Sequence, residues 1–94
     1  MAVTVRVPSA LRNECAGESM VELEVSGSTT LGALLDGLTA LHPRLGRRIR
    51  DERGRLRRFV NVFVGQDESR ALAGMDTEVP DGAEVRVIAS VAGG

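Results

Sequence analysis

Two adjacent glycines, Gly93 and Gly94, end the sequence and hold the position with the clearest chemical use. They follow a segment that alternates apolar and polar residues as far as Ser90, so we expect a flexible tail of about four residues that reaches roughly 13 Å beyond the fold. Residues without a Cβ atom can enter a narrow channel and present a free α-carboxylate to an active site on another protein. Because a terminal glycine pair arises by chance in on the order of one chain in two hundred, the pair alone is a weak signal.

The other residue types that could carry chemistry stand alone. His42 is the only histidine and has no second metal ligand near it in the sequence, so we interpret it as a helix-end residue. Cys15 is the only cysteine and lies in a polar segment without a neighbouring base, which favours an incidental thiol over a nucleophile. No spacing indicates a catalytic triad or a pair of carboxylates. We therefore predict a substrate of other enzymes, with no catalytic residue, no metal site and no cofactor of its own.

The basic residues are distributed unevenly. All twelve are arginines, and most of them lie within residues 44–58, although the net charge of the chain is −1. This segment contains no aromatic side chain on which bases could stack, which argues against binding of nucleic acid. A solvated face or a docking patch for an acidic partner is the better interpretation.

Length and composition indicate one domain with a modest core, since the chain has 94 residues of which 43% are hydrophobic. Residues 1–7 lack the long apolar run of a secretory signal peptide, and no stretch approaches the roughly 18 apolar residues of a membrane span. A single cysteine excludes an internal disulfide bond. We expect a cytoplasmic protein that does not act at a membrane.

Apolar periodicity predicts the elements of the first half of the chain. Residues 2–7 and 21–25 alternate apolar and polar side chains, which predicts a hairpin of two strands joined by a polar connection over residues 9–19. After a turn at residues 26–28, Thr29 or Thr30 can cap a helix. That helix is expected to end at His42 and Pro43 and to present one apolar face made of Leu31, Leu34, Leu35, Leu38 and Leu41.

The second half continues with one or two helical turns that carry Leu45 and Ile49, and then with a solvent loop at residues 51–54. Residues 59–64 are apolar except for Asn61, which predicts the central strand of the sheet, and residues 85–90 alternate as a last strand. The order of the elements favours an α+β fold of the β-grasp type, a mixed sheet packed on one main helix. Residues 1–90 would form this domain and residues 91–94 the tail.

The last two major strands also predict a docking surface. In the last strand Val85, Val87 and Ala89 would face the helix, which leaves Ile88 exposed beside two polar residues. Alternation does not decide whether strand 59–64 turns its phenylalanines outward or, instead, Val60, Val62 and Val64. If the two strands are neighbours, either choice extends Ile88 into an apolar patch near the tail, and such patches usually mark a partner site. We predict docking through Ile88, Phe59 and Phe63.

Together these features resemble the ubiquitin-like sulfur carriers, the group that includes the small subunit of molybdopterin synthase and the sulfur carrier of the thiamine pathway. The similarity is strongest to the longer carriers of cysteine biosynthesis in actinobacteria. The terminal motif is the specific part, whereas the strand matches mostly report the fold. The segments that carry the resemblance are spread over the chain, at residues 8–12, 28–32, 58–64, 81–82 and 91–94.

The resemblance implies a chemistry at the terminus of the chain. An activating enzyme similar to ubiquitin-activating enzymes would consume ATP and join Gly94 to AMP, and a sulfur donor would then convert the adenylate into a thiocarboxylate. A sulfur-accepting biosynthetic enzyme would use this tethered sulfur as a nucleophile. The residues implied to occupy the channel of a partner are Val91, Ala92, Gly93 and Gly94.

Two other classes of function fit the same features. A ubiquitin-like protein modifier would share the fold, the tail and the activation step, but would end as an amide on a target lysine. A non-covalent β-grasp interaction module would make the terminal glycines incidental. The chain has no lysine, which excludes self-polymers linked through lysine and leaves conjugation to other proteins open.

Overall fold

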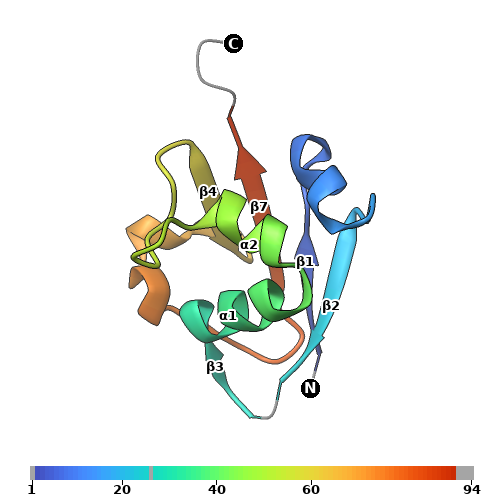
Figure 1. The fold of residues 1–94 in the computed structure, drawn as a ribbon. Coiled ribbons are helices and arrows are strands. Elements are labelled where there is room, and N and C mark those ends of the chain that lie inside the picture. Colours follow the sequence, from blue (N-terminus) through green and yellow to red (C-terminus); the bar gives the residue numbers. More distant parts are fainter. Residues whose placement is uncertain (1, 26, 91–94) are drawn as a thin grey trace.

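A five-stranded sheet in the order β2-β1-β7-β4-β5 forms the frame of the protein, and two helices lie across one of its faces (Figure 1). The computed structural model describes residues 2–25 and 27–90. Because β7 pairs parallel to β1 and antiparallel to β4, the sheet is mixed, as predicted for a β-grasp fold. The described elements are β1 Ala2–Arg6, η1 Ser9–Cys15, β2 Met20–Glu24, β3 Thr29–Thr30, α1 Leu31–Leu41, α2 Pro43–Ile49, β4 Val60–Val64, β5 Asp67–Glu68, η2 Ser69–Ala71, η3 Gly74–Asp76, β6 Glu78–Val79 and β7 Glu84–Ala89.

The predicted first hairpin is confirmed. β1 pairs antiparallel to β2, with Val3 opposite Leu23 and Val5 opposite Val21. These four side chains are buried, while the residues between them are more exposed. A period of two therefore turns one face of the hairpin toward the core, because successive side chains of a strand point to opposite faces.

Helix α1 begins where the sequence predicts. The side chain of Thr30 accepts a hydrogen bond from the backbone N–H of Ala33 (3.2 Å), so Thr30 is the cap. The buried residues of the helix are Leu31, Leu34, Leu35 and Leu38. Leu41, predicted to share this face, is 60% exposed, which corrects that prediction. Two successive steps of three residues separate Leu41 from Leu35, and because each falls short of a full helical turn, Leu41 has rotated away from the core.

The connection between β1 and β2 differs from the prediction of a polar loop. Residues Ser9–Cys15 form the 3-10 helix η1, which buries Leu11 and Cys15. The guanidinium Nε of Arg12 donates to the carbonyl of Val7 (3.0 Å) and ties this turn to the end of β1. Cys15 is thus a core residue, and the interpretation that placed it in a polar loop is wrong.

The centre of the sheet is β7, not the strand predicted from residues 59–64. β4 lies between β7 and the two-residue strand β5, which pairs only with Phe63 and Val64. The parallel pairing of β1 with β7 brings the last strand into the middle. Apolar residues on both faces of β4 indicate a central strand. Its outer face is instead partly covered by the side chains of Arg86 and Arg70.

Helix α2 follows α1 after one residue and holds the predicted buried pair Leu45 and Ile49. Pro43 occupies its first turn, where a missing backbone N–H costs no helical hydrogen bond. Gly46 brings the two helices close together, because a Cβ atom there would overlap with the side chain of Thr39. This close approach fixes α2, and with it the arginines of its last turn, relative to the sheet.

Replacing Gly46 with alanine is expected to lower the free energy of unfolding by about 1–3 kcal/mol, because the added methyl group overpacks the contact with Thr39. The Thr39 hydroxyl donates to the carbonyl of Leu35 (2.8 Å), so the side chain cannot turn away without losing this bond. Gly37→Ala is the control, since an added Cβ in this part of α1 meets nothing within 4 Å and should stabilise by roughly 0.5–1 kcal/mol. Urea denaturation measures both variants, and equal stability of the two would contradict the close approach.

Candidate functional site

The chain leaves the fold through the end of β7, and the described residues fix this exit point. The backbone N–H of Ser90 donates to the carbonyl of Phe59 (2.9 Å), which continues the pairing of β7 and β4 by one further bond. Ser90 is the last described residue. The residues predicted to enter a partner's channel, Val91, Ala92, Gly93 and Gly94, lie outside the described residues.

The structure decides which side of β4 faces outward. Val60 and Val62 are buried at 5% and 0% exposure, so they point toward the helices. Asn61 lies directly opposite Ile88, and Phe63 lies opposite Arg86. Ile88, which is 38% exposed, therefore shares the outer face of the sheet with Asn61 and Phe63.

Polar side chains interrupt this outer face. The guanidinium of Arg86 lies over the ring of Phe63, 5.1 Å from its centroid. Arg70 donates to the Asn61 side-chain oxygen (2.8 Å). The face beside the exit point is therefore an apolar centre, Ile88 with the half-buried Phe63, bordered by two arginines.

Phe59, the third residue predicted to dock, lies apart from the other two. It belongs to the turn before β4 and is 46% exposed. It lines a recess of about 560 Å³ together with Val60 and Ala89, and the guanidinium of Arg58 lies 5.5 Å from its ring centroid. Strand alternation could not place Phe59, because it precedes the first residue of the strand.

The same recess gathers arginines that the sequence placed only within one segment. Arg47 and Arg48 come from the last turn of α2, whereas Arg57 and Arg58 come from the turn before β4. Ser90 also lines the recess, so these four arginines lie on one side of the exit point of the chain. The dense arginine run of residues 44–58 was the sequence signal for this feature. Its position beside the tail depends on the fold.

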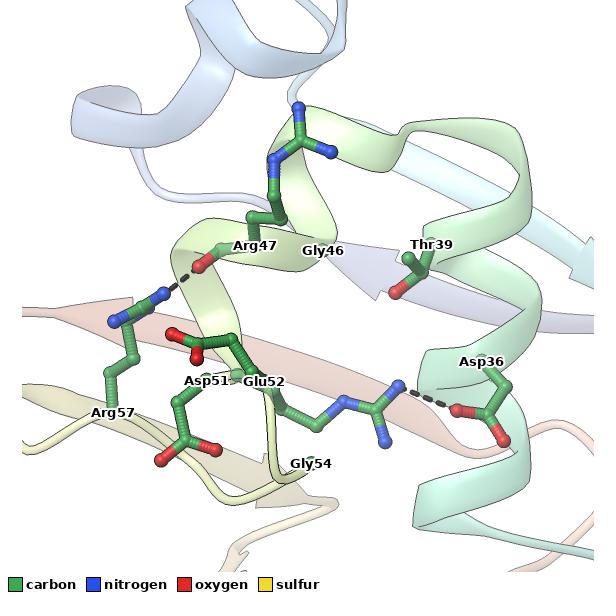
Figure 2. A pocket seen from close by; sticks show the side chains of 9 residues that line it. Asp36, Thr39, Gly46, Arg47, Asp51, Glu52, Gly54 and Arg57 are labelled. Atoms are coloured by element: carbon green, nitrogen blue, oxygen red, sulfur yellow. Dashed lines mark hydrogen bonds and ion pairs between the residues drawn. The ribbon is translucent and has the colours of Figure 1, made fainter.

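A second cavity, of about 350 Å³, lies between α1, α2 and the loop that follows α2 (Figure 2). Two contacts lie along it: Arg50 and Asp36 form an ion pair at 2.6 Å, and the Arg57 Nε donates to the backbone carbonyl of Arg47 (2.6 Å). These contacts connect the loop to both helices. We assign this cavity a structural role.

Asp51, which lines the second cavity, holds the loop in shape. Its Oδ1 accepts the backbone N–H groups of Arg55 (3.1 Å) and Arg53 (2.9 Å). These hydrogen bonds, the one from Arg55 first, lower the pKa of the Asp51 carboxyl, and the charges of Arg55 and Arg57 add to the effect. A carboxylate held ionised in this way is a poor general base.

The two remaining candidates have structural positions. His42 lies between α1 and α2, and its backbone N–H donates to the carbonyl of Leu38 (2.8 Å), which confirms the helix-end interpretation. Cys15 is 1% exposed, and its thiol donates to the carbonyl of Glu18 (3.4 Å). Burial raises the pKa of this thiol.

The part of the chain that the structure describes holds neither a metal-binding cluster nor a membrane-spanning helix. Within residues 2–25 and 27–90, no cluster of three or more histidine, cysteine or acidic side chains is arranged to hold a metal ion. In the same part of the chain, none of the helices combines the length and the apolar character needed to cross a bilayer.

Comparison with known proteins gives consistent matches along the whole chain. The sequence model of the ThiS family matches residues 5–94. The sulfur carrier protein CysO of Mycobacterium tuberculosis is 35% identical over 96 residues, with 100% of both chains covered. The molybdopterin synthase sulfur carrier subunit of the same organism is 36% identical over 92 residues, which cover 98% of this chain and 96% of the relative.

Solved structures agree with these matches. A chain of the BexX/CysO complex of Amycolatopsis orientalis superposes with a TM-score of 0.83 at 35% identity, covering 98% of this chain and 99% of the other. The small archaeal modifier protein SAMP1 of Haloferax volcanii superposes with a TM-score of 0.83 at 26% identity, covering 100% of both chains. The mixed sheet with its crossing helix is thus the fold of these proteins.

The Cys15 thiol should react at least about tenfold more slowly with iodoacetamide in the folded protein than in the urea-unfolded chain, because it is buried and its pKa is raised. The raised pKa means that the folded state holds the thiol proton more tightly, so this contribution to stability is present below the ordinary thiol pKa and is lost as the pH rises through the folded value. Equal rates for folded and unfolded protein would contradict the buried position.

Proposed function

The chain belongs to the ThiS family and is a ubiquitin-like sulfur carrier, not a catalyst, and from this premise we propose that its reacting group is the C-terminal carboxylate of Gly94. The observation that carries the proposal is the family match, which continues to residue 94, while β7 is anchored at Ser90. The fold would serve as a handle that partner enzymes grip, while the chemistry takes place at the end of the chain.

The proposed reaction has two steps, both performed by partners. A carboxylate oxygen of Gly94 attacks the α-phosphate of ATP in the activating enzyme, pyrophosphate leaves, and an acyl adenylate forms. Sulfide adds to the carbonyl carbon, and AMP departs with the former carboxylate oxygen; alternatively, a persulfide adds in the same way and a thiol then reduces the resulting S–S bond. Gly94 would now end in a thiocarboxylate, whose sulfur a third enzyme can position against its substrate.

The outer face of β7 and β4 suits the docking of the activating enzyme. Ile88 supplies exposed apolar surface two residues before Ser90, and Phe63 with Arg86 extends it. A partner that binds here would hold the chain close to the point where the tail begins. Such a central apolar anchor carries most of the binding energy in many interfaces.

A second candidate function is that of a protein modifier. The close superposition with SAMP1, described as a small archaeal modifier protein, favours it. Both functions require the same adenylate and differ in the nucleophile that displaces AMP. Mass spectrometry of the protein from its native host separates them: a carrier shows one oxygen replaced by sulfur, whereas a modifier is found attached to another protein.

Deletion of Gly94, or addition of a C-terminal tag, is expected to abolish formation of the AMP adduct by the cognate activating enzyme, because only a free α-carboxylate at the native position can be adenylated. The melting temperature should not change, since the described core ends at Ser90. The same tag at the N-terminus is the control and should leave adduct formation intact. Normal adenylation of the C-terminally tagged protein would refute the proposal.

Replacing Ile88 with aspartate should weaken binding to the activating enzyme by about 2 kcal/mol or more, roughly thirty-fold in affinity, because a charge replaces the apolar anchor. The cost in folding stability should stay within about 1 kcal/mol, the span of strand propensities. Leu41→Asp is the matched control, since Leu41 is also an exposed apolar residue but belongs to the helical layer. Calorimetric titration paired with a melting curve checks both values. Equal affinity of the two variants would place the docking surface elsewhere.

A further inference from the structure

The recess beside the exit point concentrates positive charge, and we call it the arginine recess. It has a volume of about 560 Å³ and lies where the last turn of α2, the turn before β4 and the end of β7 meet. The four arginines are exposed. Its lining residues are Leu11, Arg47, Arg48, Arg57, Arg58, Phe59, Val60, Ala89 and Ser90.

These arginines lack an acidic partner in the described part of the chain, unlike four other arginines. Elsewhere Arg6 pairs with Glu84, Arg44 with Glu14, Arg50 with Asp36 and Arg70 with Glu68. Within residues 2–25 and 27–90, none of the four recess arginines forms an ion pair, and no acidic residue lines the recess. Like charges that are gathered in one recess repel each other, and an anion bound among them relieves this repulsion.

Asp51 is close enough to Arg57 for the charge of this arginine to lower the pKa of its carboxyl. It does not line the recess. Its Oδ1 is occupied by the backbone N–H groups of Arg53 and Arg55. Arg57 in turn uses its Nε to donate to the carbonyl of Arg47. The side chains of Arg47, Arg48 and Arg58 donate no hydrogen bond within the described part of the chain, so their guanidinium groups are available to a ligand.

The floor of the recess is apolar. Leu11 and Val60 are buried at 3% and 5% exposure, and Ala89 and Phe59 lie beside them. A ligand that fits this surface carries carboxylates for the guanidinium groups and a small apolar side chain for the floor.

We propose that the arginine recess is a second docking site, which binds a carboxylate-rich segment of a protein partner that also carries apolar side chains. Guanidinium groups bind carboxylates with two parallel hydrogen bonds, which gives such a contact direction as well as strength. A nucleic acid fits less well, because Phe59 is the one aromatic ring in the lining and the chain carries a net charge of −1.

The position of the recess adds a role, and this part rests on the proposed function. A partner that binds the recess would hold the chain at Ser90, on the opposite side of the sheet from Ile88. Complementary charge speeds the encounter of two proteins more than it adds final affinity. The recess would therefore speed the delivery of the tail to a partner's active site.

The test uses the full chain and a defined probe, a short synthetic peptide rich in glutamate with two leucines. Arg48→Gln combined with Arg58→Gln removes two recess charges without touching the backbone bonds of Arg57. Arg53→Gln combined with Arg55→Gln is the matched control, because both residues are exposed, lie in the neighbouring loop and do not line the recess. Both double variants change the net charge by the same amount.

Titration followed by NMR should show shifts centred on the recess, and the first double variant should bind the peptide at least about tenfold more weakly, against less than about twofold for the control. Equal weakening of both variants would reveal a non-specific charge effect and overturn the proposal. So would the absence of binding. Tighter binding of a single-stranded RNA or of inorganic polyphosphate at the same residues would overturn the assignment to a protein partner.

A kinetic measurement separates this inference from the proposed function. The rate of AMP-adduct formation by the activating enzyme should fall with rising salt for the parent, and the first double variant should show a slower rate with a weaker dependence on salt. If no adduct forms even with the parent, the proposed function fails, while the peptide titration still decides the recess. A salt dependence that is unchanged in the first variant would exclude a role in delivery to that enzyme.

Discussion

The parallel pairing of β7 with β1 is the constraint on which the rest of the structure depends. It places the last strand of the chain at the centre of the sheet, with β4 on its other side, so the strand that leads to the exit point is supported by two neighbours. Val85 and Val87 are buried at 0% and 2% exposure against the helical layer. A central strand is among the last elements to open in local unfolding, because its hydrogen bonds and side chains are covered on both edges. The exit point at Ser90 is therefore a firm base for the proposed role of the terminal segment.

The close approach of the two helices determines where the arginines of α2 lie. Gly46 lets α2 rest against Thr39 of α1, and this contact directs the last turn of α2 toward the turn before β4. Arg57 then fastens that turn to α2 through the carbonyl of Arg47. Two short basic segments, separated in the sequence by a loop, thus come together on one side of the exit point.

The apolar centre around Ile88 lies on the other face of the same sheet. The end of β7 accordingly has a charged surface on one side and an apolar surface on the other.

Much of this fold could be predicted from the sequence, and the exceptions have physical reasons. Alternation identified β1, β2 and β7, and leucine spacing with a threonine cap identified α1, because each element buries a single face.

The 3-10 helix η1 was missed, since it is one short element with only Leu11 and Cys15 buried, too few residues to reveal a period. The sheet centre was misplaced because Phe63 gives β4 an apolar outer face, which Arg86 covers from the neighbouring strand. The arginine run is evident in the sequence, but its position beside the exit point is not, because that position depends on contacts between distant segments. Sequence reasoning is weakest wherever one residue's environment is supplied by another element.

The choice of arginine over lysine matters chemically if the C-terminal carboxylate is activated as an adenylate, as proposed. An acyl adenylate reacts with any accessible neutral amine, and a lysine near the exit point would offer one within reach of the tail. All twelve basic residues of this chain are arginines, whose guanidinium groups remain protonated at any physiological pH and have no free electron pair for attack. The chain can therefore place positive charge on one side of its exit point, in the arginine recess, without presenting a side-chain amine to the proposed adenylate. Positive charge and chemical inertness are combined in one residue type. Under the two proposals, this combination would let the same surface attract an acidic partner and leave the activated carboxyl group for sulfur.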